Sequence, residues 1–245
     1  MNIFNRGEQM KKIGLVGGLG PASTIEYYKG LISLCQREYG ADVYPEIVID
    51  SVDMSRHTKA FNEQDYHLIG EYLIKSLNNL KCAGAEITAI TANTEHIVWD
   101  RIASRLPLQT ISVVDSVIEE IIRLDYKKVL VLATEWTMAS GLYDKAIAGA
   151  GIVPVLPTKD DQKVIGNLIY PNLENGIVFP ADKLKMIDIA ERYIISEKVD
   201  AVLLGCTEIP LMIKDNDLST PVINSTEVHI RDIYKKARGK YEYKF

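Results

Sequence analysis

Short apolar runs alternate along the chain with stretches whose apolar residues recur every three or four positions. The runs typical of buried strands lie at residues 11–17, 46–50, 86–90, 128–133, 152–156 and 201–204. Between them, the spacing of Ile69, Leu73 and Leu77 predicts an amphipathic helix, and a longer helix is expected at about 181–196. Buried strands joined by crossovers of a dozen or more residues predict parallel sheets covered by helices on both faces.

The order of these elements repeats in the second part of the chain. One strand is followed by residues 92–95 (Ala-Asn-Thr-Glu), and the corresponding later strand is followed by residues 206–209 (Cys-Thr-Glu-Ile). We therefore predict an α/β fold with two pseudo-symmetric halves, each a parallel sheet covered by helices on both faces, and a cleft between them. The first half is expected to comprise residues 10–112 plus 222–245, and the second half residues 113–221.

The first nine residues stand apart from this pattern. Residues 1–9 are polar, precede a second methionine, Met10, and are expected to be a leader outside the fold. No run reaches the roughly 20 apolar residues that a membrane helix needs, and the start lacks the apolar centre of a signal peptide. We expect a cytoplasmic protein.

Composition narrows the classes of partner and site. The chain of 245 residues is 47% hydrophobic and 25% charged, with a net charge of −5 and its Lys and Arg residues scattered. This distribution excludes the basic footprint of a nucleic-acid or anionic-membrane binder. Its three cysteines are widely spaced and odd in number, which favours neither disulfides nor a zinc site, and Cys35 and Cys82 are expected to pack within helices.

Cys206 stands where a buried strand enters a polar turn. Gly205 allows the backbone to approach a ligand, and Thr207 and Glu208 add a hydroxyl and a carboxylate. Free backbone N–H groups in such a turn can hold a carboxylate and lower the pKa of a thiol. The alternative is that Cys206 is a buried small hydrophobic residue, as free cysteines often are.

A glycine-rich turn follows the first strand, at residues 17–24. A dinucleotide-binding turn would carry a third glycine where this chain has Ser23, and Pro21 removes one backbone donor. We therefore favour a smaller anion, such as a carboxylate, close to Gly18 and Gly20 at the start of the next helix.

Polar segments follow other strands at the ends where ligands bind in parallel sheets. In the predicted loop 51–58, Arg56 could grip a carboxylate and His57 could carry a proton, or both could be solvated loop residues. Asn93 and Thr94 lie in a strand-to-helix turn and can donate hydrogen bonds to an anion.

Four motifs, in order, resemble those of the cofactor-independent aspartate/glutamate racemase superfamily, on the aspartate racemase side. The motifs are Gly17-Gly18-Leu19-Gly20-Pro21 with Ser23-Thr24, Ala92-Asn93-Thr94-Glu95-His96, Leu132-Ala133-Thr134-Glu135-Trp136-Thr137 and Gly205-Cys206-Thr207-Glu208. The resemblance covers nearly everything from residue 10 to residue 237. It implies a homodimer and a reaction without cofactor or metal, in which two cysteines face each other across the substrate α-carbon.

The resemblance also implies the residues that hold an amino acid or dicarboxylate. Positions matching the family's contacts to the substrate carboxylate and amino groups are Asn93, Thr94, Thr134 and Thr207, and the same motifs contain Gly18, Gly20, Thr137 and Glu208. Family members that choose acidic substrates recognise the side chain through positions that match Arg56 or His57, and Lys163.

Cys206 matches one of the two family cysteines, but the other position holds Ala92, which cannot transfer a proton. One general acid or base is worth roughly 10²–10⁴ in rate, so two-base racemisation requires a substitute group. The neighbouring candidates are Thr91, Glu95, His57, His96 and a bound water. Ala92 is either a natural substitution or an engineered one.

Three functional hypotheses follow. The first is an amino-acid racemase acting on aspartate, glutamate or a related amino acid with Cys206 as its thiol. The second is a single-cysteine decarboxylase of the same superfamily, since one thiol facing a small residue resembles arylmalonate decarboxylases. The third is a binding protein that retains the cleft and, with Ala92, has lost the chemistry.

Overall fold

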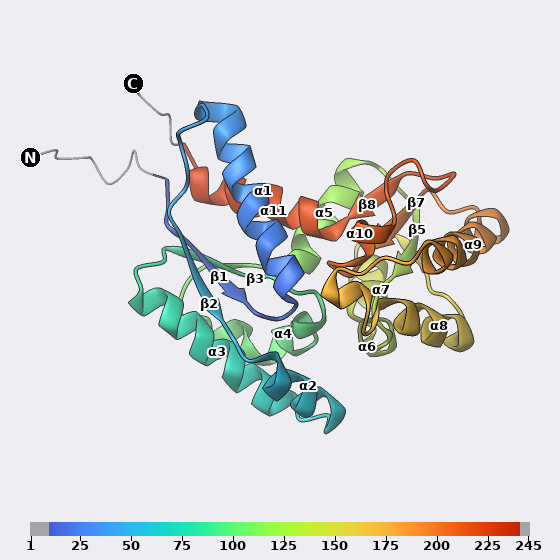
Figure 1. Ribbon diagram of the computed structural model, residues 1–245, viewed down its shortest axis with the longest axis horizontal. Coiled ribbons are helices and arrows are strands. Elements are labelled where there is room, and N and C mark those ends of the chain that lie inside the picture. The colour runs from blue at the N-terminus through green and yellow to red at the C-terminus, as the bar shows by residue number, and fades with distance from the viewer. Residues whose placement is uncertain (1–9, 241–245) are drawn as a thin grey trace, which may run out of the picture.

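Two four-stranded parallel sheets form the framework of the molecule (Figure 1). The computed structural model describes residues 10–240, so the leader proposed for residues 1–9 lies outside the described part, as do residues 241–245. The first sheet has the order β2-β1-β3-β4, with strands Ile47–Ser51, Ile13–Gly17, Ile87–Ile90 and Thr110–Ile111. The second has the order β6-β5-β7-β8, with strands Val153–Val155, Lys128–Leu132, Ala201–Leu204 and Val222–Asn224. The matching order confirms the predicted α/β fold with two similar halves.

Helices enclose both sheets. The longer ones are α1 (Pro21–Tyr39), α2 (Met54–Asn62), α3 (Tyr66–Cys82), α5 (Val113–Arg123), α7 (Leu142–Gly149), α8 (Lys159–Ile169), α9 (Pro180–Glu197) and α11 (Ser225–Arg238). Shorter turns are η1 (Thr94–Val98), α4 (Trp99–Ile102), η2 (Ala103–Arg105), α6 (Glu135–Ser140), η3 (Leu173–Asn175) and α10 (Ile209–Met212).

The inner strand β1 of the first sheet is buried on both faces. On one face, Leu31 of α1 and Ile233 of α11 share a core with Leu15 of β1. On the other face, Leu77 of α3 belongs to a core with Val16 of the same strand. Consecutive residues of β1 therefore point into different cores, which explains why the strand is apolar throughout.

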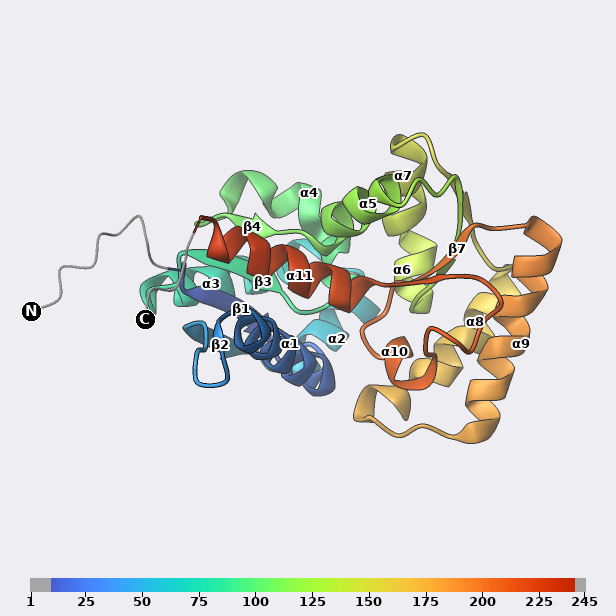
Figure 2. The same ribbon diagram turned by 90° about the horizontal axis from the view of Figure 1, so that it is seen from above.

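The second sheet lies in one continuous core that includes apolar residues of α5, α7, α8 and α9. Two helices exchange between the halves. The helix after β4, α5, packs on the second sheet, whereas the helix after β8, α11, returns to the first. The two lie side by side in the middle of the molecule (Figure 2), joined by the Ser116 hydroxyl donating to Asp232 Oδ2 at 2.7 Å.

Three expectations about local structure need correction. The last segment does not return to the first half from residue 222, because β8 pairs with β7 in the second sheet and only α11 crosses. Residues 51–58 are not a loop, because the Asp53 carboxylate accepts the Ser55 N–H at 3.0 Å and begins α2 at Met54. Cys82 is exposed, although Cys35 is buried as expected.

None of the helices within residues 10–240 combines the length and apolar character that crossing a membrane requires.

Candidate functional site

A small cavity lies between the two halves, where the turns after β3 and β7 meet. Because both strands end there, the segment after β3 and the segment after β7 bring polar side chains to one place. The cavity, of about 40 Å³, is lined from the first half by Leu19, Met54, Thr58, Phe61, Ala92, Asn93, Thr94 and Glu95, and from the second half by Thr134, Trp136, Glu174, Cys206, Thr207 and Glu208. We call it the inner cavity.

Cys206 presents its thiol to a neighbouring carboxylate. The residue is 4% exposed, and its S–H donates to Glu208 Oε2 at 3.1 Å. The Thr207 hydroxyl donates to the same oxygen at 2.7 Å. Burial, with the nearby Glu208 charge, raises the pKa of Cys206, and burial also raises the pKa of Glu208. The thiol is therefore protonated at rest, with Glu208 placed to take its proton.

Two glycines make this arrangement possible. Gly20 has φ +106°, and a Cβ there would lie 2.8 Å from Glu208 Oε1. A Cβ on Gly205 would lie 2.9 Å from the Tyr143 ring. A residue larger than glycine at position 20 would therefore displace Glu208, and one at position 205 would displace Tyr143. Gly18, also at positive φ, packs against the Val52 backbone.

Asn93 contributes an unpaired donor to the inner cavity. The Tyr143 hydroxyl donates to Asn93 Oδ1, which fixes the orientation of the amide. The residue is 3% exposed, and its Nδ2 has no hydrogen-bond partner within the described part of the chain. A buried donor without a partner is costly, so this N–H₂ group is suited to donate a hydrogen bond to a ligand oxygen.

Three threonine hydroxyls join the two halves beside Asn93. Thr94 Oγ1 lies 3.2 Å from Thr134 Oγ1 and 3.0 Å from Thr137 Oγ1, and Thr134 donates to Thr137 at 2.9 Å. Thr134 also accepts the Thr137 N–H at 3.2 Å and so caps α6. Of the three, Thr94 and Thr134 line the inner cavity.

Glu95 is the one side chain among the proposed substitutes for the first cysteine that lines the inner cavity, within residues 10–240. It is 2% exposed, and burial raises its pKa to about 8, helped by Glu208 and Glu174. Thr91 instead donates to the Val16 carbonyl at 2.9 Å. A neutral carboxylic acid near pH 7 can therefore face the substrate from the first half.

His96 and His57 are directed elsewhere. His96 Nδ1 lies 3.0 Å from the Ala92 carbonyl, and its Nε2 accepts the Val113 N–H at 3.3 Å. Burial lowers the pKa of each histidine to about 4. His57 is buried on α2 and lines a separate hollow of about 200 Å³ beside α3, so it is not the solvated loop residue considered above.

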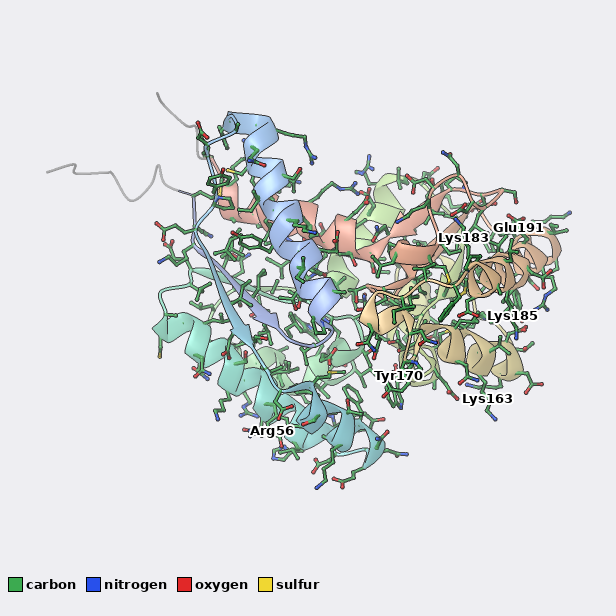
Figure 3. The ribbon with its side chains drawn as sticks, viewed as in Figure 1. Arg56, Lys163, Tyr170, Lys183, Lys185 and Glu191 are labelled. Carbon is green, nitrogen blue, oxygen red and sulfur yellow. The ribbon has the colours of Figure 1, made fainter. Side chains whose placement is uncertain are left out.

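The two cations suggested by the sequence do not line the inner cavity. Arg56 is exposed on α2, lines the same hollow as His57 and pairs with Asp53 at 3.5 Å. Lys163 is exposed on α8. Figure 3 shows Arg56 beside α2 and Lys163 beside α8, on different halves. Neither is brought to Cys206.

The sequence reasoning missed three residues on one face of α2. Met54, Thr58 and Phe61 are spaced four and three residues apart, and all line the inner cavity. That spacing would have marked a ligand-facing stripe had the segment been recognised as a helix. Phe61 also stacks on Trp136 of α6, with ring centroids 5.7 Å apart, and closes one wall.

Glu174 was also missed, and it connects the inner cavity to a larger opening. An outer hollow of about 730 Å³ is lined by Gly20, Pro21, Met54, Ser55, Thr58, Lys59, Asn62, Glu63, Tyr170, Glu174 and Asn175. Met54, Thr58 and Glu174 belong to both linings. Among the described residues, no three His, Cys, Asp or Glu side chains are grouped as metal ligands.

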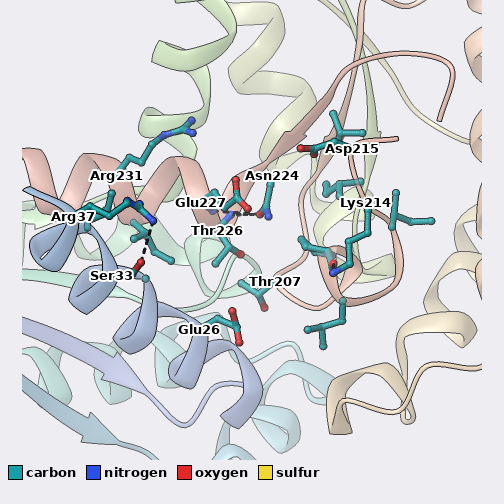
Figure 4. Close-up of a pocket in the computed structure, with 18 residues that line it drawn as sticks. Glu26, Ser33, Arg37, Thr207, Lys214, Asp215, Asn224, Thr226, Glu227 and Arg231 are labelled. Carbon is teal, nitrogen blue, oxygen red and sulfur yellow. Dashed lines mark hydrogen bonds between the residues drawn. The ribbon is translucent and has the colours of Figure 1, made fainter. Parts of the chain in front are cut away.

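A different hollow, of about 530 Å³, lies between α1, α11 and the segment after β7 (Figure 4). Thr207 lines it as well as the inner cavity, but Cys206 does not. Its walls mix acidic side chains such as Glu26 with basic ones such as Arg231, so its charge favours neither anions nor cations.

Comparisons with known proteins agree on one family. A family model described as Asp/Glu/hydantoin racemase matches residues 16–233. The broad specificity amino-acid racemase RacX of Bacillus subtilis is 27% identical over 217 residues, covering 87% of this chain and 92% of its own. The crystal structure of an aspartate racemase homologue from Pyrococcus horikoshii is 34% identical, with a TM-score of 0.81 and coverage of 93% and 99%. Picrophilus torridus aspartate racemase, 24% identical, shares the fold with a TM-score of 0.73, over 93% and 94%.

Proposed function

Because the chain belongs to the Asp/Glu/hydantoin racemase family, we propose that it is a cofactor-independent amino-acid racemase in which Cys206 and Glu95 transfer the α-proton. One observation carries this proposal. Cys206 follows β7 of the second sheet, Glu95 follows β3 of the first, and both line the inner cavity. Inversion requires an acid and a base on opposite sides of one carbon, and two facing halves can supply them.

The substrate carboxylate is proposed to lie against Asn93 Nδ2 and the hydroxyls of Thr94 and Thr134. Removal of the α-proton places negative charge on that carboxylate, so donors already fixed there stabilise the transition state more than the ground state. The support is the unpaired Asn93 amide and the hydroxyl cluster beside it. Gly18 and Thr137 do not line the inner cavity, so we assign them the role of holding the turns that position the substrate contacts.

The proton route can be followed from the resting state. Glu208 Oε2 takes the Cys206 thiol proton along their hydrogen bond. The thiolate then removes the α-proton and becomes a thiol again, leaving a carbanion delocalised into the carboxylate. Glu95, protonated near pH 7, delivers its proton to the opposite face and becomes a carboxylate. Proton exchange with water resets Glu208 and Glu95, and the same groups run the reverse direction with their roles exchanged.

A second candidate function is favoured by Ala92. Alanine lines the inner cavity where the family resemblance expects a thiol, so a protein that binds an amino acid without inverting it is the alternative. Tight binding without any exchange of the α-proton would identify it. A homodimer and a cytoplasmic location stay predictions from the sequence.

The thiol role is tested by Cys206→Ala, with Cys82→Ser at the exposed cysteine as the matched control. Chiral chromatography would follow inversion of a panel of acidic, neutral and basic amino acids. We expect Cys206→Ala to lower the rate by roughly 10²–10⁴ and Cys82→Ser to leave it unchanged. Inversion at the wild-type rate by Cys206→Ala would refute the role of the thiol.

A further inference from the structure

The ionisable side chains around the site are mostly acidic. Glu95, Glu174 and Glu208 line the inner cavity, and no Lys, Arg or His does so among residues 10–240. The outer hollow adds Glu63 and Lys59, which form an exposed ion pair at 3.9 Å. Four carboxyl groups and one ammonium therefore line the inner cavity and the outer hollow taken together. The ammonium, of Lys59, is already paired with Glu63.

The sizes of the inner cavity and the outer hollow suggest where the side chain of a bound amino acid would lie. The inner cavity, about 40 Å³, has room for the reacting end of an amino acid but not for a long side chain as well. Its shared wall with the outer hollow of about 730 Å³ is formed by Met54, Thr58 and Glu174. The other hollow, of about 530 Å³, shares only Thr207 with the inner cavity. We therefore place a side chain longer than a few atoms along the Met54–Glu174 wall, beside the apolar Met54 and the half-buried carboxyl of Glu174.

We propose that the site selects amino acids with a long side chain that ends in a cation, a primary ammonium or a guanidinium, and that Glu174 is the residue that recognises this cation. The inference rests on the proposed function, because it assumes that the α-carbon lies at Cys206. The unpaired Asn93 Nδ2 holds the carboxylate at the inner end, and the acidic wall receives the positive charge at the outer end.

An acidic side chain would meet the opposite situation. It would add a further carboxylate beside Glu174 and Glu208. Arg56 and Lys163 lie outside both linings, and Lys59, the one cation in the two linings among residues 10–240, is already paired with Glu63. Burial raises the pKa of Glu174, and the nearby Glu208 charge raises it further, so both the partial burial and that charge disfavour a second negative charge here. A bound cation would offset that charge. Tyr170, 63% exposed at the outer hollow, adds an aromatic ring that a cation can approach.

Calorimetric binding of L-lysine, L-norleucine and L-glutamate to the full chain tests the proposal. Norleucine has a similar aliphatic chain but no terminal charge. We expect lysine to bind at least about tenfold more tightly than either competitor, as a charge-assisted hydrogen bond allows. Glu174→Gln should weaken lysine binding by about the same factor and leave norleucine unchanged. Glu119→Gln, an exposed acid on α5, is the matched control.

Several outcomes would overturn the proposal. They are preferential binding of glutamate, equal binding of lysine and norleucine, no binding of any of the three, or equal weakening of lysine and norleucine by Glu174→Gln. Exchange of the α-proton in D₂O, followed in the same samples, separates the two ideas. Selective lysine binding without exchange of the α-proton would support the cation site and contradict the proposed racemase activity. Faster exchange of the α-proton of glutamate than of lysine would support the racemase activity and contradict the cation site.

Discussion

Replacing Glu95 with glutamine changes the pH dependence of stability in a way that reports its protonation state. The side chain is 2% exposed in the inner cavity, and burial raises its pKa to about 8 from an ordinary value of 4.5. The folded protein therefore keeps this proton up to about pH 8, whereas the unfolded chain releases it near pH 4.5. The stabilisation is fully present below pH 4.5 and is lost as the pH rises through 8.

The size of the effect follows from this interval. One proton contributes ~1.4 kcal/mol per pH unit, so the interval from 4.5 to about 8 sets an upper limit of roughly 5 kcal/mol. Water entry and local relaxation lower such burial penalties in real proteins, so we expect about 2 to 4 kcal/mol. Glutamine has nearly the shape of protonated glutamic acid and cannot ionise.

Urea unfolding between pH 5 and pH 8.5 measures the difference. We expect Glu95→Gln to match the wild type at pH 5 and to exceed it by about 2 to 4 kcal/mol at pH 8.5. Glu208 and Glu174 titrate in both proteins, so the difference isolates Glu95. Glu119→Gln controls for the loss of one surface charge. A difference that does not change with pH would refute a protonated Glu95 near neutrality.

Three further substitutions probe neighbouring contacts. Gly20→Ala places a Cβ 2.8 Å from Glu208 Oε1 at positive φ, so urea unfolding should show a loss of about 1 to 3 kcal/mol, and unchanged stability would contradict the close approach. Thr134→Val should lose about 1 kcal/mol with its cap of α6, while Thr134→Ser, measured alongside, should keep most of it. Adding Ala92→Cys to Glu95→Gln should restore amino-acid inversion in the chiral assay at least about tenfold, and a double variant as inactive as Glu95→Gln would argue against a shared role.

Much of the fold could be predicted from the sequence because a strand covered on both faces is a short run of apolar residues. Strands β1 and β7 contain no polar side chain, and β3 and β5 contain one each, Thr88 and Lys128, as expected of strands covered on both faces. Cys206 and Asn93 could be proposed as site residues for the same reason, since each follows such a strand at an end where ligands bind.

The exchange of helices between the halves could not be predicted in the same way. Periodicity shows that α5 and α11 each have an apolar face, but it does not tell which sheet that face covers. Placing β8 in the second sheet depends on its pairing with β7, which is a contact between distant parts of the chain.

The errors at the site have local causes. The polar segment 51–58 after a strand suggests a loop, yet the Asp53 side chain caps a helix there. Arg56 then points to a different hollow from the one that Thr58 lines. Glu174 lies in the short turn η3 between α8 and α9, which has no periodic pattern that could place it beside Cys206.

Transfer of the α-proton from opposite sides is tested most directly by proton NMR in D₂O, with the L- and D-enantiomers of lysine, glutamate and neutral amino acids supplied separately to three proteins. We expect the wild type to exchange the α-proton of both enantiomers and to invert them. Cys206→Ala and Glu95→Gln should each exchange one enantiomer only, a different one in each variant, without inversion. Exchange of both enantiomers by either variant, or no exchange of lysine, glutamate or any neutral amino acid by the wild type, would contradict proton transfer between these two residues.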